Sequence, residues 1–166
     1  MARASKLAAV AVSPAETDAR QTGSRLDLGA LDTHIGFFAR RFQVWIFQDL
    51  IRELANAEVR ISHYSVLAII EANSGLAQSE VAEAVGIEPA RLVRVLDELE
   101  RRGWIQRMRS ATDRRSHALY LTPEGQKAFA HIKDLARHHE THVIERLGAS
   151  KYGSLMRILK EIDLEP

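Results

Sequence analysis

The fold of this chain is decided by residues 77–103, AQSEVAEAVGIEPARLVRVLDELERRG. Apolar residues recur at helical spacing as far as Val85, and Gly86 stands where a left-handed residue would end a short helix. A second helix follows at once, because Pro89 suits a first turn, and Gly103 marks its end. The apolar stripe of this second helix comprises Leu92, Val95, Leu96 and Leu99. The pattern predicts two helices joined by a tight turn.

The second helix carries cations on the face opposite its apolar stripe. These are Arg91, Arg94, Arg101 and Arg102. One side can therefore pack inward while the other presents guanidinium groups, which is the division that the recognition helix of a helix-turn-helix requires.

After Gly103 the period changes from helical to alternating. Residues 104–109 and 117–121 have the pattern of two strands, and a polar turn at 110–113 separates them. Arg114 and Arg115 follow this turn directly. We therefore expect a hairpin with two cations near its tip.

Positive charge is concentrated in residues 89–117. This segment holds eight arginines, no lysine and four acidic residues, a net charge of +4, whereas the whole 166-residue chain carries +1. The remainder therefore carries about −3, and the focused basic segment favours a polyanion as partner. The alternative for each single arginine is a solvated helix face or hairpin.

Four short runs in this order resemble the MarR family of winged-helix regulators: residues 78–87, 96–103 (LDELERRG), 113–115 (DRR) and 121–125 (LTPEG). The resemblance implies a mainly α fold with a small β-wing, in which a winged helix-turn-helix is flanked by N- and C-terminal dimerisation helices. It also implies that the second helix enters the major groove of double-stranded DNA and that the wing reaches the adjacent minor groove.

The resemblance suggests which side chains contact DNA. It places Arg115 in the minor groove, with Asp113 holding a neighbouring arginine, and makes Arg91 and Arg94 the candidates for reading bases. The full set of expected DNA contacts is Ser79, Pro89, Ala90, Arg91, Arg94, Arg109, Asp113, Arg114 and Arg115. Ala77 and Glu88 depart from the family, since both stand where a Ser, Thr or Asp cap is usual. Each departure is expected to cost about 1 kcal/mol in the stability of the helix that follows.

The segments around this centre supply helices for dimerisation. From Leu28 to about Ala57 a helix carries two apolar stripes, so we expect one to face its own lobe and the other a partner chain in a homodimer. Ser62, Thr122 and Ser150 are predicted to cap later helices. The expected parts are an arm-like or disordered extension (1–25), an N-terminal dimerisation helix (26–60), the winged helix-turn-helix (61–122) and C-terminal dimerisation helices (123–166).

An aromatic run in the first long helix suggests where a small anion binds. Arg40 and Arg41 lie there, and they form either outward salt bridges or a clamp for a carboxylate or phosphate, which guanidinium groups bind bidentately. The positions expected to line an effector site are Phe38, Arg40, Arg41, Phe42, Trp45, His63 and Tyr64. The resemblance implies a small aromatic ligand, and the similarity to members that control aromatic-acid catabolism extends this to a hydroxycinnamoyl-CoA thioester.

Other functions have weaker support in the sequence. His138 and His142 have the i, i+4 spacing that can chelate zinc, so a metal-responsive regulator is one alternative. A helical interaction module with an acidic protein partner is another.

The absence of cysteine excludes thiolate chemistry and disulfides. No phosphate-binding glycine loop or nucleophile elbow suggests an enzyme or a cofactor. No apolar run is long enough for a membrane span, and the run after Lys6 is too weak for a signal peptide, so we expect a cytoplasmic protein.

Overall fold

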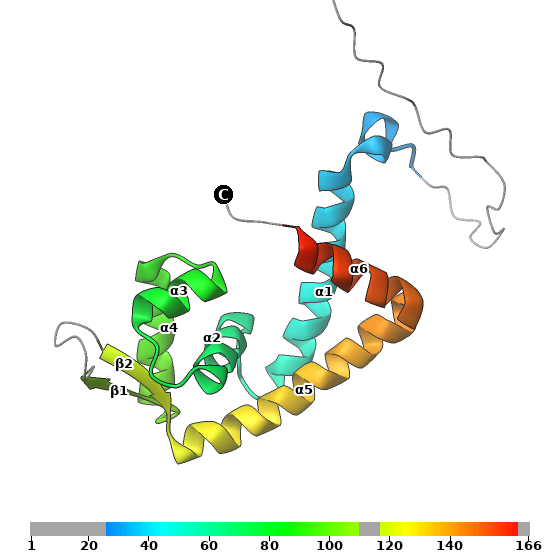
Figure 1. The fold of residues 1–166 in the computed structure, drawn as a ribbon. Coiled ribbons are helices and arrows are strands. Elements are labelled where there is room, and N and C mark those ends of the chain that lie inside the picture. The colour runs from blue at the N-terminus through cyan, green and yellow to red at the C-terminus, as the bar shows by residue number, and fades with distance from the viewer. Residues whose placement is uncertain (1–25, 110–116, 163–166) are drawn as a thin grey trace, which may run out of the picture.

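The computed structural model describes residues 26–109 and 117–162 of the chain. Within these residues the fold is helical apart from one hairpin, which confirms the mainly α prediction (Figure 1). The elements in chain order are a short 3-10 helix η1 (Gly29–Thr33), α1 (Ile35–Ala55), α2 (Ile61–Ala72), α3 (Gln78–Val85), α4 (Pro89–Arg101), β1 (Ile105–Arg109), β2 (His117–Leu121), α5 (Pro123–Leu147) and α6 (Ala149–Glu161).

Helices α2, α3 and α4 pack together with the hairpin into one unit, which we call the winged lobe. Strands β1 and β2 are antiparallel, with Ile105 opposite Leu121 and Arg109 opposite His117. The segment before α3 extends this sheet, because the Gly75 N–H donates to the Leu119 carbonyl (2.9 Å) and the Leu119 N–H donates to the Leu76 carbonyl (3.0 Å). The hairpin is thereby fixed to the start of α3.

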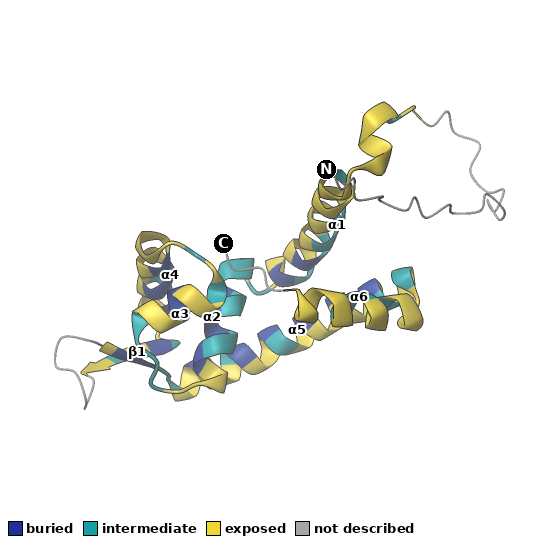
Figure 2. Ribbon diagram, turned by 45° about the horizontal axis from the view of Figure 1, so that its top comes forward, coloured by how far each residue is buried: buried dark blue, intermediate teal, exposed yellow. Residues whose placement is uncertain are grey.

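The remaining helices extend away from the winged lobe. In Figure 1, α5 runs from the hairpin past α1 to α6, and α1 contacts both α2 and α5. Figure 2 shows that buried residues gather within the winged lobe and along one side of α5, whereas α1 and α6 are mostly exposed. The largest buried side chains include Phe129, Leu54, Leu67, Leu96 and Leu119. One core therefore joins the winged lobe to the end of α1 and the first half of α5.

The predicted turn signals around α3 and α4 are confirmed. Gly86 ends α3 with φ +67°, a left-handed conformation that glycine adopts without steric cost. Pro89 is the first residue of α4. Thr122 caps α5, since its Oγ1 accepts the Gly125 N–H (2.9 Å) and donates to the Gly103 carbonyl (2.6 Å).

Two other predicted caps are wrong. Helix α2 begins at Ile61 rather than after Ser62, and the backbone N–H of Arg60 donates instead to Nδ1 of His63 (3.3 Å). Helix α6 begins at Ala149, with Gly148 at φ +81° before it, so Ser150 lies inside the first turn. In both cases the serine lies one position inside the first helical residue, where its side chain cannot serve as the cap.

The first long helix is also shorter than predicted. The segment from Leu28 is a 3-10 turn, and extended backbone at His34 (φ −97°, ψ 109°) separates it from α1. Gly29 adopts φ +53°, and its N–H donates to the Asp27 side chain (2.8 Å), so an α-helix cannot pass through it.

Candidate nucleic-acid interface and the adjoining hollow

Helix α4 presents a charged face to solvent because its apolar stripe is fully used in the core. Leu92, Val95, Leu96 and Leu99 are buried, whereas Arg91, Arg94 and Arg101 are exposed. Glu88 precedes the helix without a side-chain capping bond, as the sequence predicts. Arg102, which was expected on the same outward face, instead lies over the Trp104 ring (4.9 Å) and donates to the Glu58 carbonyl (3.0 Å).

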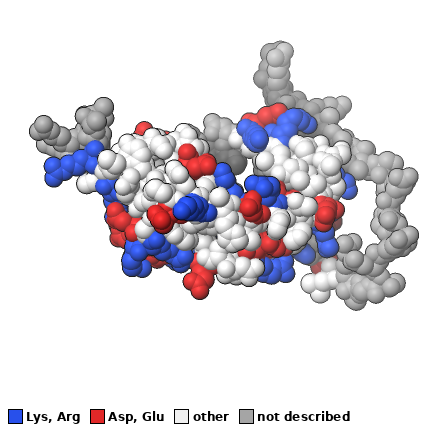
Figure 3. Space-filling model, turned by 90° about the horizontal axis from the view of Figure 1, so that it is seen from below, with Lys and Arg blue, Asp and Glu red and all other residues white. Residues whose placement is uncertain are grey.

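Acidic residues on α4 are neutralised by cations from other elements. Arg107 on β1 donates from Nη1 to Glu100 (2.6 Å) and from Nη2 to Asp97 (2.6 Å), and Arg60 pairs with Glu98. Within the described part of the chain, no carboxylate pairs with Arg91 or Arg94. Figure 3 shows acidic and basic side chains interspersed over the face of the molecule that is seen from below. Pairing of the α4 carboxylates with Arg60 and Arg107 leaves the guanidinium groups of Arg91 and Arg94 without a carboxylate partner among the described residues.

The expected DNA-binding residues fall into three places. Ala90, Arg91 and Arg94 lie together on α4 beside Pro89, whereas Ser79 is exposed in the first turn of α3. Arg109 is exposed at the end of β1. The expected contacts Asp113, Arg114 and Arg115 lie outside the described residues.

A hollow of about 630 Å³ lies between α1, the start of α2 and α4. Its lining combines apolar side chains with three arginines and two glutamates, and includes Ile51, Val59, Ile61, Arg60, Arg91, Arg94, Glu88 and Glu98. The two candidate base-reading arginines therefore share this hollow with a cation from the start of α2. An amphipathic anion has the chemistry that such a lining can bind.

Glu98, Arg60 and His63 join α4 to the start of α2. The carboxylate of Glu98 accepts from the Arg60 guanidinium and lies 2.9 Å from Nε2 of His63, which is 1% exposed. Because Nδ1 of His63 already accepts the Arg60 backbone N–H, the ring proton is assigned to Nε2, which donates to Glu98. Arg60 and His63 together lower the pKa of Glu98 to about 2, and burial lowers the pKa of His63. At neutral pH the group is thus a neutral histidine and an ionised pair.

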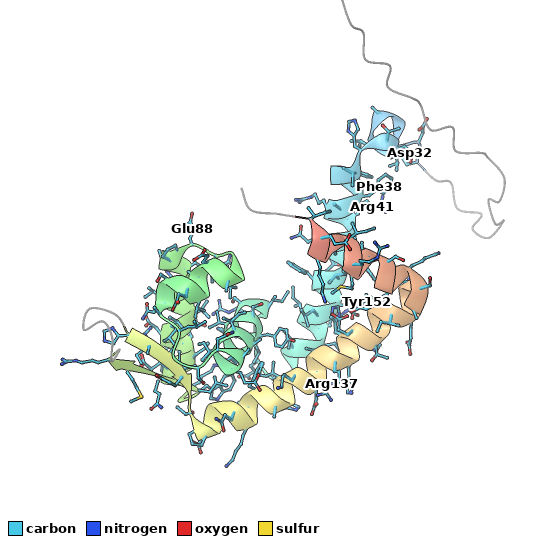
Figure 4. All side chains as sticks on the ribbon, viewed as in Figure 1. Asp32, Phe38, Arg41, Glu88, Arg137 and Tyr152 are labelled. Carbon is cyan, nitrogen blue, oxygen red and sulfur yellow. The ribbon has the colours of Figure 1, made fainter. Side chains whose placement is uncertain are left out.

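The expected effector residues do not form one site in the single chain. Arg40, Arg41 and Trp45 line a separate hollow of about 350 Å³ on α1, where the Arg41 guanidinium lies over the Phe37 ring (5.6 Å). Phe38 and Phe42 pack on aromatic neighbours but do not line this hollow. Figure 4 shows Phe38 and Arg41 on the outer part of α1, distant from Glu88.

The two α2 residues of that set lie elsewhere. His63 is covered by Glu98, and Tyr64 packs against Phe129 of α5 with ring centroids 6.1 Å apart. Sequence reasoning missed Arg60, Glu98 and Ile51, because no periodicity or motif brings α1, α2 and α4 together at one hollow.

A second polar cluster holds α5 on α1. Nδ1 of the buried His139 lies 2.7 Å from Oδ2 of Asp49, and His142 lies 3.6 Å from Asp49 and 3.8 Å from Glu53. The hydrogen bond from His139 lowers the pKa of Asp49.

His138, the other member of the histidine pair considered for zinc, lines a different hollow with Asp134, Arg137 and Thr141. Within residues 26–109 and 117–162, no three His, Cys, Asp or Glu side chains are placed to hold a metal ion, and no helix is long and apolar enough to cross a membrane.

Known proteins resemble this chain over most of its length. Residues 59–117 match the sequence model of the MarR family. The chain is 33% identical over 135 residues, 81% of each chain, to a proposed transcriptional regulatory protein for the hcr operon of Thauera aromatica. The transcriptional repressor CouR bound to a 23-mer DNA duplex superposes with a TM-score of 0.78 at 37% identity, covering 82% of this chain and 97% of CouR. CouR bound to p-coumaroyl-CoA gives 0.75 at 34% identity, covering 86% of this chain and 100% of that one.

Proposed function

Because the chain belongs to the MarR family of transcriptional regulators, we propose that it is a repressor that binds a pseudo-palindromic DNA operator as a homodimer. A small aromatic acid or its CoA thioester releases the operator. The protein is a DNA-binding regulator and not an enzyme, and we expect it to act in the cytoplasm, where it can reach chromosomal DNA.

The observation that supports DNA binding is the pairing of charged side chains on α4. Its three carboxylates are paired with Arg60 and Arg107, while Arg91 and Arg94 are exposed on the same helix. A recognition helix needs exposed donors for base edges and phosphates, and unpaired carboxylates beside them would repel the duplex. The contacts of Arg109 and of Arg115 on the wing remain predictions.

Homodimer formation is supported by the apolar faces of the outer helices. Five side chains of α1 are between 43% and 86% exposed in the single chain: Ile35, Phe38, Val44, Phe47 and Ile51. On α6, Ile158 and Leu159 are similarly exposed. Such apolar surface on α1 and α6 favours burial against a second copy. A two-fold dimer would place its two α4 helices about one DNA turn apart, roughly 10 bp.

The effector part of the proposal is supported by chemistry and by the relative bound to p-coumaroyl-CoA. The hollow between α1, α2 and α4 has apolar walls and three arginines, which suit an aromatic acyl group and an anion. Arg40 and Arg41 offer a second cationic hollow on α1 for the phosphates of a thioester. The effector set Phe38, Arg40, Arg41, Phe42, Trp45, His63 and Tyr64 stays a prediction.

Selection from a pool of random duplexes tests the proposal and defines the operator sequence in the same experiment. The full chain is expected to enrich one pseudo-palindrome, and its affinity should fall by several decades over a few-fold rise in salt. p-Coumaroyl-CoA, p-coumarate, coenzyme A and zinc are then tested for release of that duplex. Enrichment of no sequence, or sizing as a stable monomer, contradicts the proposal, whereas silence of all four probes refutes only the effector class.

A further inference from the structure

Arg60 and Glu98 form a partly exposed ion pair in the lining of the hollow that contains the candidate base-reading arginines. The Arg60 side chain is 63% exposed and that of Glu98 is 30% exposed, and both line the hollow. Glu98 lies on α4, whereas Arg60 immediately precedes α2. The pair therefore ties the recognition helix to the rest of the lobe at a point that a solute can reach.

The two hydrogen-bond partners of Glu98 differ in how easily a solute can reach them. His63 is buried, and its Nε2–H is directed at the Glu98 carboxylate because Nδ1 is held by the Arg60 backbone. The Arg60 guanidinium is exposed, so an anion that enters the hollow can reach it. Glu98 can therefore lose Arg60 without losing every hydrogen-bond partner.

We propose that Arg60 and Glu98 form a latch on the recognition helix, which the anionic part of the effector opens by replacing Glu98 on Arg60. This step rests on the proposed function, an effector-released repressor. In the closed latch, the ion pair adds to the buried apolar stripe of α4 in holding the helix where it presents Arg91 and Arg94. In the open latch, the effector holds Arg60, α4 loses this restraint, and the bound anion faces the same two arginines in the hollow.

The exchange is one anion for another and needs no proton transfer. The pKa of Glu98 is about 2, because Arg60 and His63 donate to it, so it is ionised throughout the neutral range. A carboxylate or phosphate of the effector then competes with Glu98 for a single guanidinium, as charge-assisted hydrogen bonds of similar strength permit.

If the effector replaces Glu98 on Arg60, substitution of Glu98 and substitution of Arg60 should change effector affinity in opposite directions. Titration calorimetry of the full chain with p-coumaroyl-CoA should show tighter binding in Glu98→Gln and weaker binding in Arg60→Gln, each by about fivefold. A purely structural pair would weaken binding in both variants. Glu88→Gln is the matched control, because it removes the same charge from the same hollow without freeing Arg60. Weakening in both variants, or equal tightening in Glu88→Gln and Glu98→Gln, overturns the latch.

A second probe keeps this test separate from the identity of the effector. If the wild-type chain does not bind p-coumaroyl-CoA, that ligand is wrong, and inorganic pyrophosphate is titrated into the same proteins. The latch then predicts the same opposite shifts for pyrophosphate. Equal pyrophosphate affinity in the wild type, Glu98→Gln and Arg60→Gln, or no binding to Glu98→Gln, overturns it.

Discussion

His139 of α5 is hydrogen-bonded to Asp49 of α1 through Nδ1 and Oδ2, 2.7 Å apart, and this bond joins the two longest helices of the structure. His139 is buried, while Arg52 donates to the other carboxylate oxygen of Asp49 at 3.0 Å. The carboxylate of Asp49 thus accepts from two donors on two helices and adds a polar contact to the apolar packing between α1 and α5.

Removal of this carboxylate should destabilise the protein. In Asp49→Ala the buried His139 ring loses its partner, and we expect the free energy of unfolding to fall by about 1–3 kcal/mol. Urea denaturation at a fixed protein concentration measures this loss. Asp134→Asn is the control, since the Asp134–Arg137 pair lies on the surface and its loss should change stability by less than about 1 kcal/mol. Equal losses in the two variants would contradict this role of Asp49.

Acid should destabilise the protein from near pH 6.5 downward through His63. Burial lowers the pKa of His63 below its ordinary value of 6.5, so the unfolded chain binds this proton at a higher pH than the folded chain does. Stability is therefore lost as the pH falls below 6.5, by at most about 1.4 kcal/mol per pH unit for one proton.

The non-titrating variant His63→Gln isolates this contribution. Between pH 7.5 and 5.5 its unfolding free energy should fall less than that of the wild type. The carboxylate of Glu98, with a pKa of about 2, does not titrate in this range. Identical pH profiles for the two proteins would show that His63 is not the responsible group.

Arg107 should support DNA binding without contacting DNA. In Arg107→Gln, Asp97 and Glu100 lose their cation and remain as negative charges on the recognition helix, so operator affinity should fall by about tenfold. The triple variant Arg107→Gln, Asp97→Asn, Glu100→Gln removes those charges and should recover most of the affinity. If affinity is not recovered, Arg107 acts on DNA directly.

Arg91 should determine sequence preference. Its removal in Arg91→Ala is expected to weaken operator binding by about 1–3 kcal/mol and to relax discrimination at one base pair. Competition binding with operator duplexes altered one pair at a time measures both effects. A uniform loss on all duplexes would make Arg91 a phosphate contact.

Gly125 has no room for a side chain. A Cβ there would lie 1.8 Å from the carbonyl oxygen of Trp104, so Gly125→Ala should lower the free energy of unfolding by about 2 kcal/mol or more through backbone displacement. Gly153→Ala on α6 is the matched control, because no atom lies within 4 Å of its Cβ position. That change should stabilise the helix by about 0.5–1 kcal/mol. Melting temperatures of both variants decide the comparison.

The sequence predicted the elements whose signals are local. Gly86, Pro89 and Thr122 act on their own helix ends, and the apolar stripe of α4 is buried as its spacing indicates. Ser62 and Ser150 failed as caps because several neighbouring residues could begin those helices.

The candidate site was less predictable because its residues meet through tertiary packing. Arg60 and Glu98 are 38 positions apart, and no repeat or motif links them. Arg40 and Trp45 share a hollow on one helix, whereas His63 and Tyr64 belong to the packing around α2. The arginines and aromatic residues indicated anion binding. That they line two separate hollows could be seen only in the structure.

Because α5 is attached to the wing at one end, a small rotation of this long helix displaces the wing. The Thr122 N–H donates to the Trp104 carbonyl (3.0 Å), so the first turn of α5 cannot move without the start of β1. Its 25 residues span about 37 Å at 1.5 Å per residue, and a rotation of about 5° about the far end moves the wing by about 3 Å. In the proposed dimer, the distance between the two wings would therefore depend on the angle at which α5 meets its neighbouring helices, and a small change in that angle would shift the wings by several ångströms at the DNA.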